Sequence, residues 1–234
     1  MEGLLDFARG PLFRLTFAIM ILGLLRVFVL DIIQAYEAYR KAGDKVVPWG
    51  KLTLQALSWL VPVNRVFRNR PVYSILSVLF HIGLLITPIF LFAHVALWQG
   101  YLGIPWLTLS YDVAYGLTIL TIVTAGLLLV MRFASGASSY ISRKQDYLWP
   151  MILLVPFVTG FLCAHMGLSP EGYQVSMLVH IFAAELIFLL IPFTKIAHCV
   201  LMPLSQFISA IAWKFPADTD EKIAVTLNKK GEPV

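Results

Sequence analysis

Long hydrophobic segments alternate with shorter polar segments along the whole chain of 234 residues. Five of the hydrophobic segments approach or exceed the ~20 residues that an α-helix needs to span a hydrocarbon core of ~30 Å. They cover residues about 12–35, 72–98, 112–132, 148–166 and 176–202. The pattern predicts an all-α integral membrane protein with five transmembrane helices in a single membrane domain, followed by a tail over residues 203–234.

The composition excludes an ordinary soluble domain. Hydrophobic residues make up 59% of the chain and charged residues 13%, and the mean hydropathy is +0.80. The first hydrophobic segment is too long, and is followed by too many others, to be a cleaved signal peptide. Little length remains for a soluble catalytic domain, so we expect any chemistry in water to come from a partner.

The basic residues predict how the chain is oriented. Segment 36–70 holds seven of them, and the connection after the third span and the tail hold more, whereas connections 99–111 and 167–175 hold none. By the positive-inside rule the basic segments face the cytoplasm, which places the N-terminus outside and the C-terminus inside. We expect a multi-pass protein of the cell inner (cytoplasmic) membrane, with a net charge of +5 that reflects this sidedness and attraction to anionic lipid. The charge does not indicate nucleic-acid binding.

Four of the five histidines lie in two of the hydrophobic segments. His81 and His94 lie in segment 72–98, and His180 and His198 lie in segment 176–202. One histidine in a membrane helix often only hydrogen-bonds a neighbouring helix, but ionisable residues at membrane depth are costly and often functional. These four match by depth, His81 with His198 near the cytoplasmic face and His94 with His180 near the outer face. The pattern predicts two stacked haem groups, an inner and an outer one, that carry electrons across the bilayer.

The spacing within each segment tests whether both histidines share one helix face. Eighteen residues separate His180 from His198, which is five helical turns, so both lie on one face of an unbroken helix. Thirteen residues place His94 about 140° from His81 on an ideal helix. A kink or local unwinding at Pro88 would restore the alignment.

Haem propionates require cations, and three residues are candidates: Arg26, Arg132 and Lys195. Snorkelling to the cytoplasmic head groups is the alternative for Arg132 and Lys195. Arg26 lies deeper in the first span, where a specific partner is expected, either a propionate or Asp31.

Short motifs of the chain resemble a known family. FLLIPFTKIAH at 188–198, with a histidine eighteen positions before its last residue, is similar to the haem-binding helix of the gamma subunit of membrane-bound respiratory nitrate reductase. LFHIG at 79–83 and GLLR at 23–26 resemble that family too. The five-span topology agrees, so the likeness covers nearly the whole chain. The histidine spacing in the second span is longer here, and the basic segment 36–70 looks more like the related membrane cytochromes of heterodisulfide-reductase-like and sulfate-respiration complexes.

The resemblance implies a di-haem cytochrome b that exchanges electrons with quinol near the outer haem and with an iron–sulfur subunit on the cytoplasmic side. It places the inner-haem ligands at His81 and His198 and the outer-haem ligands at His94 and His180. The implied cofactors are two haem b groups, with quinone or quinol as substrate.

The fifth histidine, His165, lies at the outer end of the fourth span. It is a surface histidine, a quinone-site base or a replacement ligand for the outer haem. Glu171 and Tyr173 follow in the same outer connection and are candidates for relaying a proton, or residues of a solvated turn. Glu185 lies about 140° around the helix from His180 and is a candidate for a proton path, because a buried carboxylate in a membrane is costly.

Two other functions compete with electron transfer. The chain could be a haem-free membrane anchor for a soluble redox enzyme, which the basic segment 36–70 would also suit. It could be a proton or solute transporter that uses the membrane histidines and Glu185. Transporters often carry internal repeats, and this sequence shows none.

Overall fold

The structure, a computed structural model, describes residues 1–58, 70–212 and 218–230. Over these ranges it is helical, with no strand. Five helical stretches are long and apolar enough to cross a membrane: Glu2–Lys41, Pro71–Phe90, Tyr111–Ala134, Lys144–His165 and Pro170–Phe193. A bilayer requires each spanning segment to satisfy its own backbone hydrogen bonds, which a helix does. The predicted all-α, five-helix, multi-pass membrane fold is confirmed.

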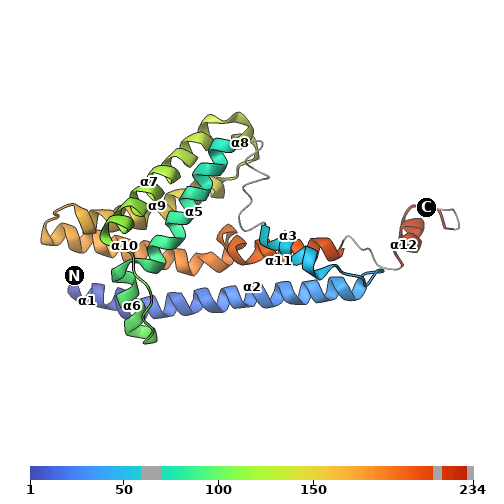
Figure 1. The fold of residues 1–234 in the computed structure, drawn as a ribbon, viewed down its shortest axis with the longest axis horizontal. Coiled ribbons are helices and arrows are strands. Elements are labelled where there is room, and N and C mark those ends of the chain that lie inside the picture. The colour runs from blue at the N-terminus through green and yellow to red at the C-terminus, as the bar shows by residue number, and fades with distance from the viewer. Residues whose placement is uncertain (59–69, 213–217, 231–234) are drawn as a thin grey trace. The chain divides into compact units, whose positions relative to one another are not determined.

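The chain forms two compact units, which are described separately. Unit 1 comprises Met1–Thr16 and Val63–Ile187, and unit 2 comprises Phe17–Pro62 and Phe188–Val234. In chain order (Figure 1) the elements are α1 (Glu2–Phe7), a π-helical turn η1 (Ala8–Leu12), α2 (Phe13–Lys41), α3 (Trp49–Ser58), α5 (Pro71–Phe90), α6 (Phe92–Leu102), α7 (Tyr111–Ala134), α8 (Gly136–Ile141), α9 (Lys144–His165), α10 (Pro170–Leu190), the 3₁₀ turns η2 (Ile191–Phe193) and η3 (Lys195–Ala197), α11 (His198–Ala212) and α12 (Thr219–Thr226).

The helix boundaries differ from the predicted spans. The first helical stretch runs from Glu2 to Lys41, well beyond the predicted 12–35, because an apolar run marks the hydrocarbon crossing and not the helix length. Polar turns at both ends remain helical outside that run. In the segment predicted as a tail, residues 203–234, α11 continues to Ala212 and α12 follows in the part that the structure describes.

The predicted span 72–98 is broken at Leu91. Pro88 lies inside the last turn of α5, where it cannot donate a backbone hydrogen bond and crowds the preceding turn. Leu91 is extended, with φ −65° and ψ 131°, and α6 begins at the next residue. The local unwinding considered from the sequence is therefore present, three residues after the proline.

The break is stabilised by three hydrogen bonds to carbonyls in the last turn of α5. Pro88 O accepts from the Nδ1 of His94 at 3.0 Å, and Ile89 O accepts from the indole N–H of Trp106 at 2.8 Å. Phe90 O accepts from the backbone N–H of Leu109 at 2.9 Å. A carbonyl at a helix end lacks an intrahelical partner and is costly to bury unsatisfied. The break thus fixes the ring of His94.

The predicted span 176–202 also does not continue as one helix. It passes through η2 and η3 between residues 191 and 197, with an extended Thr194 (φ −133°, ψ −176°). Pro192 and the Thr194 side chain, which accepts from the N–H of Ile196 at 3.5 Å, account for the interruption. The prediction that an unbroken helix places His180 and His198 on one face is therefore wrong, because the turns between them are not α-helical.

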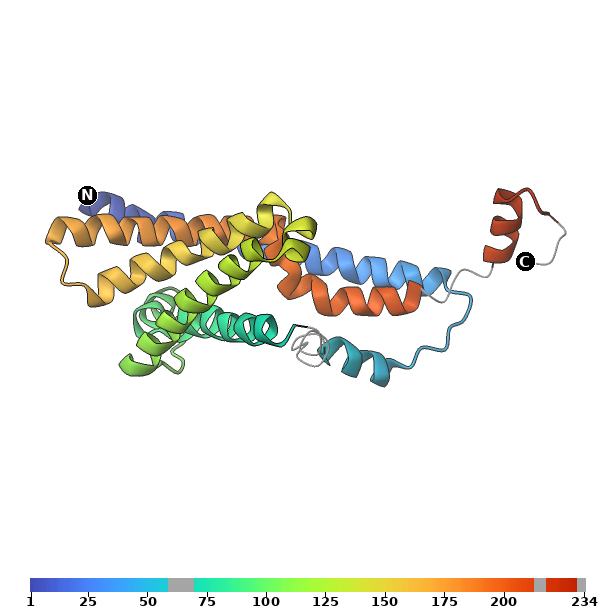
Figure 2. The same ribbon diagram turned by 90° about the horizontal axis from the view of Figure 1, so that it is seen from above.

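Within unit 1, α5 and α7 pack on each other (Figure 1) and cross at an angle when seen from above (Figure 2). Apart from Phe80, the buried residues of the two helices are small or hydroxylated: Ser74, Gly83, Thr87, Ala114, Thr121, Thr124 and Ala125. A Cβ at Gly83 would overlap the Thr121 hydroxyl and lie 2.9 Å from Leu117 O. Gly83 thus serves close helix packing, which is typical of membrane proteins.

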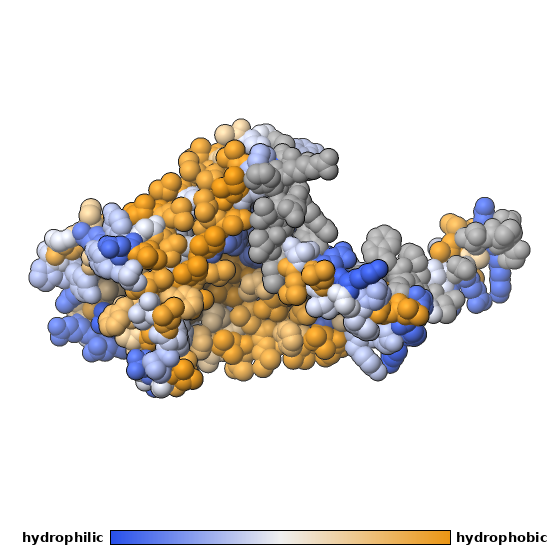
Figure 3. All heavy atoms as spheres, in the orientation of Figure 1, coloured by the Kyte–Doolittle hydropathy of each residue, from blue (hydrophilic) through white to orange (hydrophobic). Residues whose placement is uncertain are grey.

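The faces of α5 and α7 turned away from this contact are apolar (Figure 3). Val72, Ile75, Val123 and Val130 are each about half exposed or more. Lipid is the matching environment for such faces.

Unit 2 contains most of α2 together with α3, α11 and α12. The side chain of Pro192 packs against α2 at Gly23, where a Cβ would lie 2.6 Å from the proline ring. The rings of Phe17 and Phe188 also meet, with centroids 6.2 Å apart. The helices α3 and α11 pack on each other. In α12, a hydrogen bond from Lys222 lowers the pKa of Asp218.

Candidate cofactor site

His94 on α6 and His180 on α10 meet in unit 1. Their ring centroids are 5.9 Å apart and the ring planes are inclined by 22°. The sequence predicted this pair as the outer ligands, and the structure brings the two rings together. An imidazole nitrogen binds a metal ion at about 2 Å, so two rings that share one ion have centres about 6 Å apart. The observed separation fits this requirement.

Ring separation alone also fits an ordinary aromatic contact, so the hydrogen bonds of the rings carry more weight. His94 Nδ1 lies 3.0 Å from Pro88 O, and His180 Nδ1 lies 2.8 Å from Pro156 O. A carbonyl oxygen only accepts, so Nδ1 carries the proton in both rings. In the neutral rings Nε2 then carries the lone pair, which is the arrangement of a histidine that ligates a metal.

In the other two histidines of the predicted set, Nδ1 likewise lies within hydrogen-bond distance of a backbone carbonyl. His81 Nδ1 lies 2.6 Å from Ser77 O, one turn earlier in α5, and His198 Nδ1 lies 2.8 Å from Lys195 O. All four therefore have Nδ1 bonded to a backbone carbonyl. His81 belongs to unit 1 and His198 to unit 2, so their pairing as inner ligands stays a prediction.

The backbone of α9 positions the His180 ring. Ser176 and His180, one turn apart on α10, both donate to α9 carbonyls, to Thr159 O at 3.2 Å and to Pro156 O at 2.8 Å. Gly160 makes room for the ring: a Cβ there would lie 2.9 Å from Cε1 and 3.0 Å from Nδ1 of His180. Sequence reasoning missed Gly160, because only the fold brings it to the histidine.

An aromatic group lies on the same face of α6 as His94. Trp98 and Tyr101 follow it by four and seven residues, the spacing of one helix face. The ring of Phe13 lies 5.0 Å from Trp98 and 5.6 Å from Tyr101. The Arg14 guanidinium lies 5.3 Å from the Tyr101 ring centre. The helical spacing after His94 was a signal that could have found Trp98 and Tyr101.

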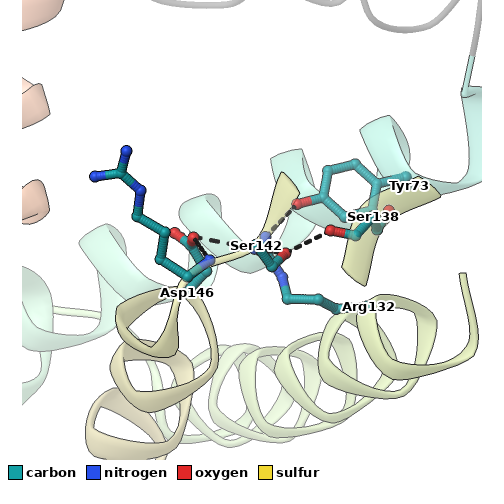
Figure 4. A network of polar contacts seen from close by, with 6 residues as sticks. Tyr73, Arg132, Ser138, Ser142 and Asp146 are labelled. Carbon is teal, nitrogen blue, oxygen red and sulfur yellow. Dashed lines mark hydrogen bonds and ion pairs between the residues drawn. The ribbon is translucent and has the colours of Figure 1, made fainter. Parts of the chain in front are cut away.

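The three propionate candidates lie in different surroundings. Arg132 donates to Tyr73 Oη and to Ser142 Oγ, each at 3.1 Å, and lies 4.0 Å from the Asp146 carboxylate (Figure 4). These partners satisfy Arg132 within the protein. Arg26 and Lys195 are exposed in unit 2, and their assignment to propionates stays a prediction.

His165, the last residue of α9, has a side chain rather than a backbone carbonyl as the partner of its Nδ1. Its Nδ1 lies 2.7 Å from the hydroxyl of Tyr111, and its ring lies 4.8 Å from Tyr115 and 4.9 Å from Phe161. Tyr111 is 67% exposed, so the pair lies at the surface of the protein. The sequence did not predict Tyr111, Tyr115 or Phe161. Tyr and His together can hold or pass a proton.

The remaining candidates are Glu171, Tyr173 and Glu185. Glu171 and Tyr173 lie exposed in the first turns of α10. Glu185 is only 3% exposed, and neither of its carboxylate oxygens has a hydrogen-bond partner among the described residues. Asp31 on α2 in unit 2 is likewise buried, with Oδ2 unpartnered there; no hydrogen bond to it from Arg26 is present in the described structure.

No cluster of three or more His, Cys, Asp or Glu side chains suited to a metal ion occurs in the described ranges. A pair of histidines suits a metal that brings its other ligands with it, as haem iron does with its porphyrin nitrogens. The His94–His180 pair is thus a fitting axial ligand pair and an incomplete site for a bare ion.

Comparison with known proteins identifies a relative without identifying a function. No family model matches the chain, and no solved structure matches it. A protein of Nitratidesulfovibrio vulgaris (strain Hildenborough), whose name states no activity, is 33% identical to it over 153 residues. The alignment covers 64% of this chain and 66% of the relative, so the chain spans a little under two thirds of the relative's length.

Proposed function

We propose that this chain is a di-haem cytochrome b subunit of a membrane redox complex. It exchanges electrons between the quinone pool, at an outer site, and an iron–sulfur redox subunit on the cytoplasmic side of the cell inner membrane. The observation that supports this most is the shared geometry of His81, His94, His180 and His198, each with Nδ1 bonded to a backbone carbonyl. The motif resemblance to the nitrate reductase gamma subunit and its relatives points the same way.

In this proposal His94 and His180 hold the outer haem, and His81 and His198 hold the inner haem. The carbonyl contacts orient the rings and raise their basicity as ligands. Bound haem supplies one-electron transfer, with a potential set by its axial ligands and burial. Arg26, Arg132 and Lys195 remain the candidates to pair with propionates, and of these Arg132 is engaged by Tyr73, Ser142 and Asp146.

The Tyr111–His165 pair is the proposed contact for the quinone head group. Oxidation of a quinol releases two protons with its two electrons, so the site needs a group that accepts a proton near neutral pH. His165 supplies that group, and its hydrogen bond to the exposed Tyr111 leads toward water. The rings of Tyr115 and Phe161 provide flat apolar surfaces beside it. Glu185 remains the candidate for proton movement deeper in the membrane.

An absorption spectrum of the purified full chain, reduced minus oxidised, tests this function. We expect b-type bands with about two haem groups per polypeptide by pyridine haemochrome. A His165→Ala variant should keep both haem groups and lose quinol-driven reduction, which separates the quinone contact from a haem ligand. Absence of haem in protein expressed with ample haem supply would leave the chain a haem-free anchor or a transporter.

A further inference from the structure

A cavity of about 330 Å³ opens in unit 1 where α5 begins and α7 ends. This end carries the basic residues that predict the cytoplasmic side. Arg70, Tyr73, Ser135 and Ser138 provide the polar part of its lining, and Val72 and Met131 belong to the apolar part. None of these residues takes part in the proposed haem or quinone sites, so the cavity requires its own explanation.

The polar lining presents hydrogen-bond donors. Arg70 donates to Ser138 Oγ at 2.6 Å. The hydroxyl proton of Ser138 and most of the guanidinium protons of Arg70 are not used in this hydrogen bond and can be donated to another acceptor. Tyr73 Oη accepts from Arg132 at 3.1 Å, so its own proton is available to another acceptor. Ser135 Oγ likewise accepts, from the backbone N–H of Ser138 at 3.3 Å.

The charge around the cavity favours an anion. Arg70 lines the cavity directly and is exposed. Arg132 does not line the cavity but donates a hydrogen bond to Tyr73, which does (Figure 4). The carboxylate of Asp146, which lies 4.0 Å from Arg132, also accepts from the backbone N–H of Arg143 at 2.8 Å. The charged N–H groups of an arginine form strong hydrogen bonds with phosphate oxygens.

The apolar part of the lining distinguishes a lipid from a free anion. Val72 is 60% exposed beside the cavity, and Met131 lies at its α7 side. A soluble phosphate cannot use these side chains, whereas the glycerol and first acyl carbons of a phospholipid can. Anionic phospholipids are concentrated at the cytoplasmic surface. We propose that this cavity, the Arg70 cavity, binds the phosphate group of an anionic phospholipid.

The test uses the purified full chain in detergent and measures lipid retention by native mass spectrometry, together with thermal stability after added lipid. Wild-type protein should retain phosphatidylglycerol through delipidation and unfold at a higher temperature when it is added back. Arg70→Gln and Ser138→Ala should each weaken binding, by about tenfold for Arg70→Gln, which corresponds to ~1.4 kcal/mol. Lys144→Gln removes an exposed cation near the same end, outside the cavity lining, and should bind as wild type does.

Addition of inorganic phosphate distinguishes a site for a phospholipid phosphate group from a site for a soluble phosphate. If it stabilises the protein as well as phosphatidylglycerol does, the cavity is a site for a soluble anion and the lipid assignment is wrong. Equal lipid retention by Arg70→Gln and wild type, with Arg70→Gln folded by circular dichroism, also overturns the proposal. Because the readout requires no haem, its outcome is independent of the proposed electron-transfer function.

Discussion

Substitution of Gly160 by alanine tests how the outer histidine is held. The added Cβ would lie 2.9 Å from His180 Cε1 and 3.0 Å from His180 Nδ1. Carbon atoms in contact prefer about 3.5–4.0 Å, so the ring must retreat by more than ~0.5 Å. The Nδ1 hydrogen bond to Pro156 O, now 2.8 Å long, then exceeds the ~3.2 Å limit of a good hydrogen bond.

The expected magnitude follows from the role of that hydrogen bond. Loss of a partner that orients a metal-binding histidine typically costs ten- to a hundredfold in metal affinity. Replacement of glycine by alanine in a helix interior is worth up to about 1 kcal/mol in favour of the helix. The crowding of the His180 ring costs about 1–3 kcal/mol, which offsets or exceeds that gain in helix propensity. Gly160→Ala should therefore still fold, with a thermal midpoint at or below that of wild type, and bind the outer haem about ten- to a hundredfold more weakly.

The assay is haem content per chain after purification, combined with circular dichroism for the fold. Gly126→Ala is the matched control, since a Cβ at Gly126 meets nothing within 4 Å on the membrane helix α7. It should gain helix stability and keep both haem groups. If Gly160→Ala binds haem as tightly as Gly126→Ala does, the close contact with the His180 ring is not what orients a ligand.

Two further predictions concern packing and the quinone contact. Gly83→Ala forces α5 away from the α7 backbone and should destabilise the protein by about 1–3 kcal/mol. The thermal midpoint in detergent should therefore fall for Gly83→Ala and rise for Gly126→Ala. Equal midpoints for the two variants would contradict the close packing of α5 on α7 at Gly83. Tyr111→Phe removes the hydroxyl 2.7 Å from His165 Nδ1 and should slow quinol-driven haem reduction about a hundredfold, without change in haem content. Tyr140→Phe, a control at an exposed tyrosine of α8 outside the proposed sites, should leave the rate unchanged, and equal rates for the two variants would exclude the Tyr111 relay.

The five-helix fold could be predicted from hydropathy because a bilayer imposes one length and one hydrogen-bonding solution on every span. Hydropathy does not register the breaks at Leu91 and Thr194, and only the unwinding near Pro88 was considered from the sequence. Pro88 and Pro192 signalled both places. A proline marks where a helix is weakened, but whether it kinks or ends depends on neighbouring donors such as Trp106 Nε1.

The outer histidine pair could be predicted because matched depth follows directly from position along two spans. The groups that position the His180 ring could not be predicted from the sequence. Gly160 and the carbonyl of Pro156 reach His180 from another helix, and nothing in the sequence near His180 identifies them. The same applies to Tyr111, which lies 54 residues before its partner His165.

The most direct measurement of the central claim is the haem content and redox-difference spectrum of His94→Ala and His180→Ala side by side. If the two imidazoles bind one iron, each variant loses the same one of two haem groups, with identical remaining spectra and potentials, while His165→Ala keeps both. Full haem content in either His94→Ala or His180→Ala would contradict the assignment.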